Sequence, residues 1–180
     1  MKIYAAGKVA QGNWRERIFG IRGVWDLDDM EKMTPWPEIK GDDSNPFTGE
    51  DWTYVGPYAL SCDHGCMHGA NQHGLNADGT GEGGAYPGVH RDEIHRRCLE
   101  AIDACTHVFA WIDDPTAYGT LVEIGYALAR GKSVHVYFDS AKRSSLLDLW
   151  FAAYSGKFAW AANADSAWSA FLRQPRDEWS

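Results

Sequence analysis

The sequence predicts an α/β fold, a three-layer sandwich around a mostly parallel sheet, on three observations. Short apolar runs alternate with helical patterns in the second half of the chain. Strand, loop, helix and strand follow one another in the order that forms a right-handed parallel crossover. The chain has 180 residues, which is enough for one core without disulfides. We therefore expect a single domain over residues 1–180.

The first part of the chain predicts one strand and a long insert. The apolar run KIYAA at residues 2–6 predicts a strand that ends at Gly7, where a small residue allows close approach of a ligand. After a weak helical pattern at 12–22, a stretch rich in Gly, Pro, Asp and Asn covers about 26–88. It is too long for an ordinary connection, so we expect a loop-rich excursion over a site or a small extra sheet around residues 52–60.

Beyond the insert the pattern becomes regular. Residues 90–104 predict a helix, and the apolar run at 106–112 predicts a buried strand. Residues 118–130 predict the next helix, with Thr116 or a neighbour as its cap and Gly131 as its stop.

The last part of the chain completes the layers. Residues 133–138 predict another buried strand, and the segments 145–154 and 163–172 predict helices that cover the sheet. The result is a Rossmann-like, flavodoxin-like arrangement, in which ligands bind at the carboxyl ends of the strands. We therefore expect the floor of a site in the turn that follows the strand at 106–112.

The composition narrows the class of ligand. A formal net charge of -8 and a pI near 5.3 argue against a protein that binds polymer nucleic acid. Nine Trp, eight Tyr and seven Phe suit a pocket that stacks a flat ring. No apolar run reaches the roughly 18 residues of a membrane span, and the start of the chain lacks a signal-peptide pattern. We expect a cytoplasmic protein with a small-molecule ligand.

The expected turn and the helix after it carry groups suited to chemistry. Asp113 and Asp114 lie in the turn, Gly119 and Thr120 start the helix, and Glu123 follows one turn later. Unpaired amides at a helix start bind a phosphate or a ribose oxygen. Glu123 stays ionised beside the positive end of the helix dipole and is a candidate nucleophile. The alternative is that Glu123 only balances that dipole.

Three segments resemble a known family: KIYAAG, ACTHVFAWID and AYGTLVEIGYALARGKSV. They are similar to the nucleoside 2-deoxyribosyltransferase family, whose members open with K-I-Y-x-A-G. Members also carry D-x-G-T-x-x-E-x-G-x-A-x-x-x-G-K-x-V after a strand. The resemblance covers roughly half of the chain, at its beginning and over about 90–139.

The resemblance implies roles for particular residues. Glu123 matches the Glu that attacks the anomeric carbon and forms a glycosyl-enzyme, which a second base or water then resolves. Tyr4 matches the Tyr that touches the nucleophile, and Gly7 matches the Gly after the first strand. Without the resemblance, Tyr4 is equally well explained as a core tyrosine. The resemblance also implies a homodimer or larger oligomer, and it implies no organic cofactor.

Two family carboxylates are missing here. The family Asp six residues before the nucleophile falls at Ala117, and a second family Asp falls near Cys98. Glycosyl transfer still needs a group that protonates the departing base or hydrogen-bonds to it. Asp113 or Asp114 is a candidate replacement, although either also fits a helix cap or a solvated turn.

A second cluster lies in the insert, in SCDHGCMHGANQHG. Its thiol and imidazole groups are zinc ligands, so Cys62, His64 and Cys66 predict a possible structural zinc site, although the spacing is irregular. Alternatively, His64 or His68 contacts the substrate as an acid or base in place of the missing aspartates. Ordinary loop packing is the third interpretation.

The leading hypothesis is an enzyme that cleaves or transfers at the N-glycosidic bond of a nucleoside or nucleotide. A NAD-type glycohydrolase is one alternative, because the bond between nicotinamide and ribose is also N-glycosidic. A non-catalytic nucleotide-binding sensor is the other, since the usual aspartates are missing. The base, the sugar, the need for a 5′-phosphate and the acceptor are left open by the sequence.

Overall fold

The computed structural model describes residues 1–8, 14–19, 48–49, 52–57 and 91–174. Contacts within the chain define two compact units. The first comprises Met1–Lys8, Thr48–Gly56 and Ala101–Ser180, and the second comprises Val9–Phe47 and Pro57–Glu100. All the described strands belong to the first unit, and the prediction of a single domain stays a prediction.

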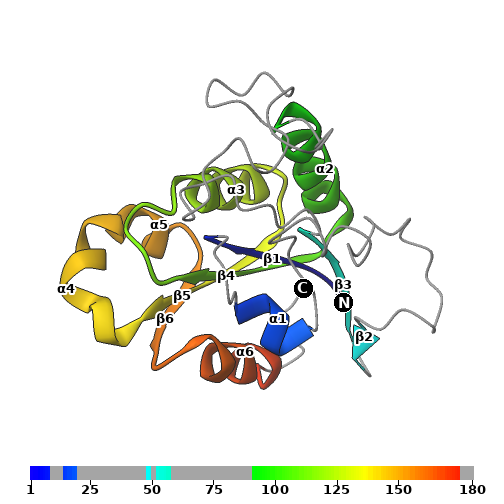
Figure 1. The fold of residues 1–180 in the computed structure, drawn as a ribbon. Coiled ribbons are helices and arrows are strands. Elements are labelled where there is room, and N and C mark those ends of the chain that lie inside the picture. The colour runs from blue at the N-terminus through cyan, green and yellow to red at the C-terminus, as the bar shows by residue number, and fades with distance from the viewer. Residues whose placement is uncertain (9–13, 20–47, 50–51, 58–90, 175–180) are drawn as a thin grey trace, which may run out of the picture. The chain divides into compact units, whose positions relative to one another are not determined.

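The first unit contains a six-stranded sheet with the strand order β2-β3-β1-β4-β5-β6 (Figure 1). Five strands run parallel: β3 (Trp52–Gly56), β1 (Lys2–Gly7), β4 (His107–Ile112), β5 (Ser133–Asp139) and β6 (Lys157–Ala161). The short β2 (Thr48–Gly49) pairs antiparallel with β3. The predicted α/β fold with a mostly parallel sheet is confirmed.

Helices cover both faces of this sheet. The helix α3 (Tyr118–Ala129) packs on β1, β4 and β5, and α6 (Ala164–Leu172) packs on β4, β5 and β6 from the opposite face (Figure 1). The three predicted layers are therefore present. Between β5 and β6 the chain forms the 3₁₀ turn η3 (Ser140–Lys142) and three further short pieces described below.

The predicted end of α3 is confirmed. Gly131 has a φ of 68°, in the left-handed region where a residue without Cβ is favoured. The amides of Gly131 and Lys132 donate to the carbonyl oxygens of Leu128 and Ala127, which closes the helix in a Schellman motif. The chain then enters β5 directly.

Three parts of the prediction were wrong or incomplete. Trp52–Gly56 is not a small extra sheet but the strand β3 of the main sheet, parallel to β1. The strand β6 was not predicted. The helix expected at 145–154 is split into α4 (Arg143–Leu146), the 3₁₀ turn η4 (Leu147–Leu149) and α5 (Trp150–Tyr154). Among residues 143–154 only Leu146 and Ala153 are buried, which leaves too little buried apolar surface to hold one long helix.

Two helices include residues of the second unit. α1 (Trp14–Phe19) falls within the weak pattern at 12–22, and its Trp14 and Phe19 rings lie 6.1 Å apart. α2 (Arg91–Ala104) confirms the helix expected at 90–104, and its last four residues belong to the first unit. Most of the predicted insert lies outside the described residues.

Candidate functional site

Three segments of the first unit meet at the carboxyl edge of the sheet. β1 ends at Gly7, whose register partner on β4 is Trp111, and β4 ends one residue later. The turn after β4 leads directly into α3. The sequence places the candidate residues on these segments, and parallel pairing brings the segments together.

A tyrosine of β1 and a carboxylate of α3 are paired on one face of the sheet. Tyr4 lies opposite Val108 on the face of the sheet that α3 covers, and its hydroxyl donates a hydrogen bond to Glu123 Oε1. Tyr4 is fully buried and Glu123 is half-buried. Glu123 follows the buried Thr120 by three residues, so it lies on the side of α3 that turns toward the sheet. The contact between Tyr4 and Glu123 that the resemblance implies is therefore present in the structure.

Gly56 makes room for the tyrosine ring. It pairs with Tyr4 in the register of β3 and β1, and its φ is 150°, a conformation that other residues rarely adopt. A Cβ at this position would lie 3.3 Å from Tyr4 Cε2 and 3.1 Å from the Cβ of Ala101. Sequence reasoning did not single out Gly56, because its partner strand is distant in the chain.

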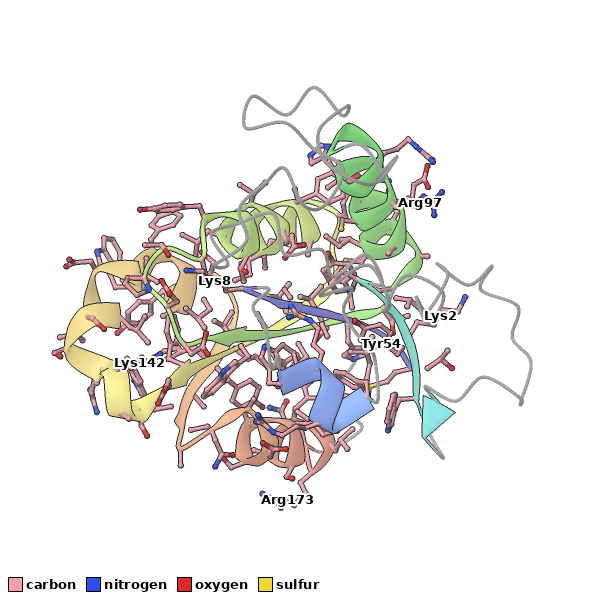
Figure 2. All side chains as sticks on the ribbon, in the orientation of Figure 1. Lys2, Lys8, Tyr54, Arg97, Lys142 and Arg173 are labelled. Atoms are coloured by element: carbon pink, nitrogen blue, oxygen red, sulfur yellow. The ribbon has the colours of Figure 1, made fainter. Side chains whose placement is uncertain are left out.

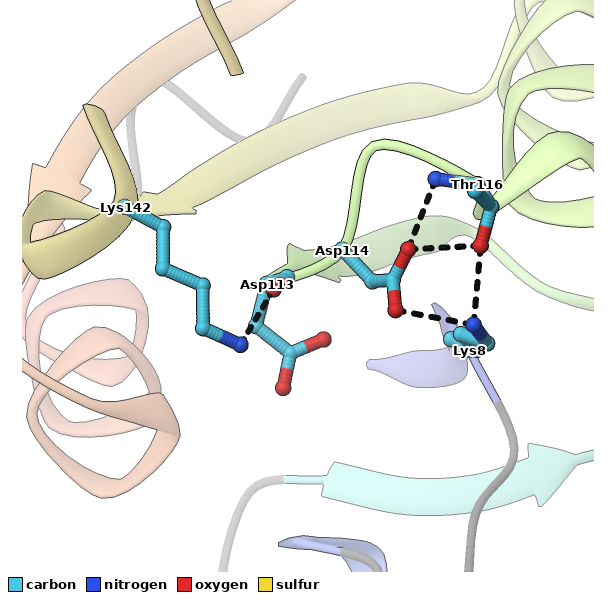
Figure 3. Close-up of polar contacts among 5 residues, drawn as sticks. All are labelled: Lys8, Asp113, Asp114, Thr116 and Lys142. Carbon is cyan, nitrogen blue, oxygen red and sulfur yellow. Dashed lines mark hydrogen bonds and ion pairs between the residues drawn. The ribbon is translucent and has the colours of Figure 1, made fainter. Parts of the chain in front are cut away.

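Lys8, Asp114 and Thr116 form a second polar group at this edge, here called the Lys8 cluster (Figure 3). Lys8 Nζ lies 2.8 Å from Asp114 Oδ2 and 2.8 Å from Thr116 Oγ1. Asp114 Oδ1 accepts from the amide of Thr116 at 2.7 Å and from its hydroxyl at 2.6 Å. Figure 2 shows Lys8 at the tip of β1, beside the loop that leads from β4 to α3.

These contacts determine the protonation of Asp114. Hydrogen bonds from Lys8 and then from Thr116 favour the ionised form and lower the pKa of Asp114 to about 2. Asp114 is therefore an anion near neutral pH and has no proton to give to a departing base. The neighbouring Asp113 is half-buried, and its main-chain oxygen accepts from Lys142 Nζ at 2.6 Å (Figure 3).

α3 starts at residue 118 as predicted, but its cap differs from the prediction. The N-cap is Ala117, with no side-chain cap, and Thr116 bonds to Asp114 instead of capping the helix. The amides of Gly119 and Thr120 lie in the first turn, where helix geometry gives them no partner within the helix. A Cβ on Gly119 would have no heavy atom within 4 Å, so the backbone is open on that side.

The two positions that lack a family carboxylate, Ala117 and Cys98, lie in different units of the chain. Ala117 is 4% exposed, and its amide donates to the carbonyl oxygen of Asp114 at 3.2 Å. Cys98 lies on α2, in the part of that helix that belongs to the second unit. Lys8, which sequence reasoning missed, contacts the turn that holds Ala117 through Asp114 and Thr116, and Lys142 contacts the same turn at Asp113. The sequence signal was a lysine directly after the first strand.

The predicted zinc ligands and histidine contacts lie outside the described residues. The roles of Cys62, His64, Cys66 and His68 stay predictions. Among the residues that the structure describes, no group of three or more His, Cys, Asp or Glu side chains could hold a metal ion. Cys105 is a free, buried thiol, and burial raises its pKa to about 11.

Comparisons with known proteins identify the family. The family model of nucleoside 2-deoxyribosyltransferase matches residues 62–161, which is more than half of the 180 residues. Comparison with curated proteins and with solved structures found no match. Among the described helices, none is long and apolar enough to cross a membrane. The match includes Glu123 and the turn before α3, so the resemblance seen in the sequence is confirmed: the chain belongs to the nucleoside 2-deoxyribosyltransferase family.

Proposed function

We propose that this protein is an enzyme that cleaves the N-glycosidic bond of a nucleoside or nucleotide with Glu123 as its nucleophile. Membership of the family supports glycosyl transfer at nucleosides. The observation that carries the proposal is the hydrogen bond from Tyr4 to Glu123, between β1 and the helix that starts at the carboxyl edge of the sheet. At this edge, parallel α/β folds bind their ligands.

The geometry suits a two-step displacement. A Glu123 carboxylate oxygen attacks the anomeric carbon, the bond from that carbon to the base nitrogen breaks, and its electron pair leaves with the base. The Tyr4 hydrogen bond fixes one carboxylate oxygen and thereby orients the other. Water or a second base then attacks the anomeric carbon and releases Glu123, which yields hydrolysis or transfer.

The remaining parts of the site bind the substrate in this proposal. The amides of Gly119 and Thr120 hold a sugar oxygen or a 5′-phosphate at the start of α3. Gly7 lets the sugar approach the end of β1. Asp113 stays a candidate for contact with the substrate, whereas Asp114 positions Lys8, because its carboxyl group is ionised.

Several expectations belong to the proposal as well. The chemistry needs no organic cofactor, and a zinc ion at Cys62, His64 and Cys66 would be structural. His64 and His68 are proposed contacts of the substrate. A homodimer or larger oligomer and a cytoplasmic location complete the proposal. Light scattering after size exclusion would measure the oligomer, and a fall in the melting temperature on chelation would reveal the metal.

The test measures the release of free base by chromatography. The panel contains ribo- and deoxyribonucleosides, their 5′-monophosphates and NAD, each with and without a second free base. Wild type is compared with Glu123→Gln, which removes the charge at constant shape, and with Asp148→Asn, the same change at an exposed position of η4. We expect release in wild type and Asp148→Asn and loss in Glu123→Gln. Equal release in all three proteins would refute Glu123 as nucleophile.

A second candidate function is a non-catalytic nucleotide sensor. The observation that favours it is the buried Ala117 at the position of a family Asp, together with an ionised Asp114 beside it. A sensor would release no base from any member of the panel. It would instead show a rise in melting temperature with ligand that Glu123→Gln leaves almost unchanged.

A further inference from the structure

A departing base needs a hydrogen-bond donor, and the described part of the site offers one in an unexpected place. Asp114 is ionised and can only accept, and Ala117 has no polar side chain. Lys8 extends from the end of the same strand that holds Tyr4. Its ammonium lies 2.8 Å from Thr116 Oγ1, directly before Ala117 and at the start of the helix that carries Glu123.

The charge of the Lys8 cluster indicates what kind of group it meets. Lys8 and Asp114 form an ion pair at 2.8 Å, so the positive charge is already balanced locally. A phosphate approaching Lys8 would meet the Asp114 carboxylate as well, and like charges repel. A neutral acceptor, such as a carbonyl oxygen or a ring nitrogen, meets the ammonium without that cost.

Because the ammonium only donates hydrogen bonds, it distinguishes bases by the acceptors that they present. Lys donates three hydrogen bonds and accepts none, so the base atoms that meet it must be acceptors. Guanine presents two acceptors, N7 and O6, whereas adenine presents an acceptor and the N6 amino donor. In the pyrimidines the contrast is between the O4 acceptor of an oxo base and the N4 amino donor of cytosine.

We propose that Lys8 contacts the base of the substrate and selects oxo bases, such as hypoxanthine, guanine and uracil, over the amino bases adenine and cytosine. The proposal rests on the proposed function, because it names the substrate class of the same site. As the Glu123 oxygen bonds to the anomeric carbon, the bond to the base breaks and its electron pair spreads into the carbonyl oxygen. Lys8 donates a hydrogen bond to this oxygen and keeps its own proton, and water protonates the released base.

The experiment measures kcat/KM for matched pairs of substrates. Deoxyinosine and deoxyadenosine differ in the 6-substituent, and deoxyuridine and deoxycytidine differ in the 4-substituent. The ribo or 5′-phosphorylated forms replace them if wild type prefers those. A hydrogen bond to a charged donor supports a preference of roughly tenfold or more for the oxo partner in wild type. The ratio within a pair does not depend on how much of a variant is folded.

Two variants test whether Lys8 causes the preference for oxo bases. Lys8→Met keeps the length of the side chain and removes the donor, so we expect the ratio to fall toward one in both pairs. Lys8→Arg keeps a cationic donor, so we expect the preference for the oxo base to be retained. A wild-type ratio near one, or a ratio that Lys8→Met leaves unchanged, would overturn the proposal.

The outcomes separate this inference from the proposed function. Base release that depends on Glu123 but shows no effect of Lys8→Met on the ratio would reject the role of Lys8 alone. Absence of release from every substrate, in wild type as in Glu123→Gln, would reject the proposed function and the role of Lys8 with it. If release persists in Glu123→Gln while the ratio depends on Lys8, the role of Lys8 is supported and Glu123 is not the nucleophile.

Discussion

The face of the sheet covered by α6 and the face covered by α3 are filled by different side chains. On the α6 face, Phe109 lies 5.2 Å from Trp168 and 5.5 Å from Phe171 between ring centroids, and His135 lies 5.1 Å from Phe171. On the α3 face, the sheet presents smaller residues at several positions, among them Ala6, Ala110 and Val136. Interlocked rings bury a large apolar area on the first face.

The comparison explains how one sheet supports both stability and chemistry. Small side chains let α3 come close to the strands, so that the Tyr4 hydroxyl reaches Glu123. On the α6 face, His135 and Tyr137 lie against the aromatic rings of Phe171 and Phe109. We therefore expect changes on the α6 face to alter the free energy of unfolding and changes around Tyr4 and Glu123 to alter the rate.

The largest expected effect is on the α6 face. Phe171 is fully buried, and Phe171→Ala leaves a cavity among the rings. We expect the free energy of unfolding to fall by about 3–5 kcal/mol, measured by urea titration. The control is Phe158→Ala on β6, where the side chain is 41% exposed and the expected loss is much smaller. Equal losses would contradict the assignment of the core to this face.

The next prediction compares the loss of one tyrosine hydroxyl on each face of the sheet. Tyr4→Phe removes the donor to Glu123, and we expect kcat to fall about 10- to 100-fold, the scale of a hydrogen bond to a charged group. Tyr137→Phe removes a hydroxyl on the α6 face that accepts from Gln174 Nε2 at 3.0 Å. It should leave kcat unchanged. Similar rates for the two variants would show that Tyr4 is only a core residue.

A smaller effect concerns acid sensitivity on the α6 face. Burial lowers the pKa of His135 to about 4 from the ordinary 6.5, with contributions from Lys157 and His107. Between these values the unfolded chain binds a proton that the folded chain does not, so stability falls as the pH falls. The slope from this group is at most about 1.4 kcal/mol for each pH unit.

His135→Phe keeps a ring and removes the titrating group. We expect a flatter dependence of the unfolding free energy between pH 6.5 and 4 than in wild type. An unchanged slope in His135→Phe would show that the folded protein accommodates a charged imidazole at this position.

The smallest effect belongs to the Lys8 cluster. The lowered pKa of Asp114 contributes stability that is complete above the ordinary value of 3.8 and is lost as the pH falls toward about 2. Because Asp114 is partly exposed, we expect Asp114→Asn to cost at most about 1 kcal/mol at pH 7. The difference from wild type should vanish below the acid transition. A difference that persists at pH 2 would place its origin outside the ion pair.

Much of the fold followed from local patterns in the sequence. The strands β1, β4 and β5 are short apolar runs that end at glycine or charged residues, and α3 ends at Gly131 as expected. The strand β6 gave no such signal, because it lies at the sheet edge with three exposed positions in five. The place of β3 depends on pairing with β1, some fifty residues away, which local periodicity does not encode.

The candidate site was predictable where a motif carried it. Glu123 was named from its place near the start of the helix and Tyr4 from the resemblance, and the structure brings them into contact. Lys8 and Gly56 were missed, because their importance arises from contacts with distant segments: Lys8 contacts the turn after β4, and Gly56 contacts Tyr4 of β1. Asp114 was named, with Asp113, as a candidate for the group that protonates the departing base or hydrogen-bonds to it. The protonation of Asp114 depends on Lys8, a partner more than a hundred residues away.

The most direct test of the account is to trap the glycosyl-enzyme. Wild type, Glu123→Gln and Asp148→Asn are incubated with 2-fluoro-substituted analogues of the best substrate, since fluorine slows the second step. Intact mass and peptide mapping then locate any adduct. The account predicts one added sugar on the peptide that contains Glu123, in wild type and Asp148→Asn but not in Glu123→Gln. An adduct on another residue, or base release with no adduct, would contradict it.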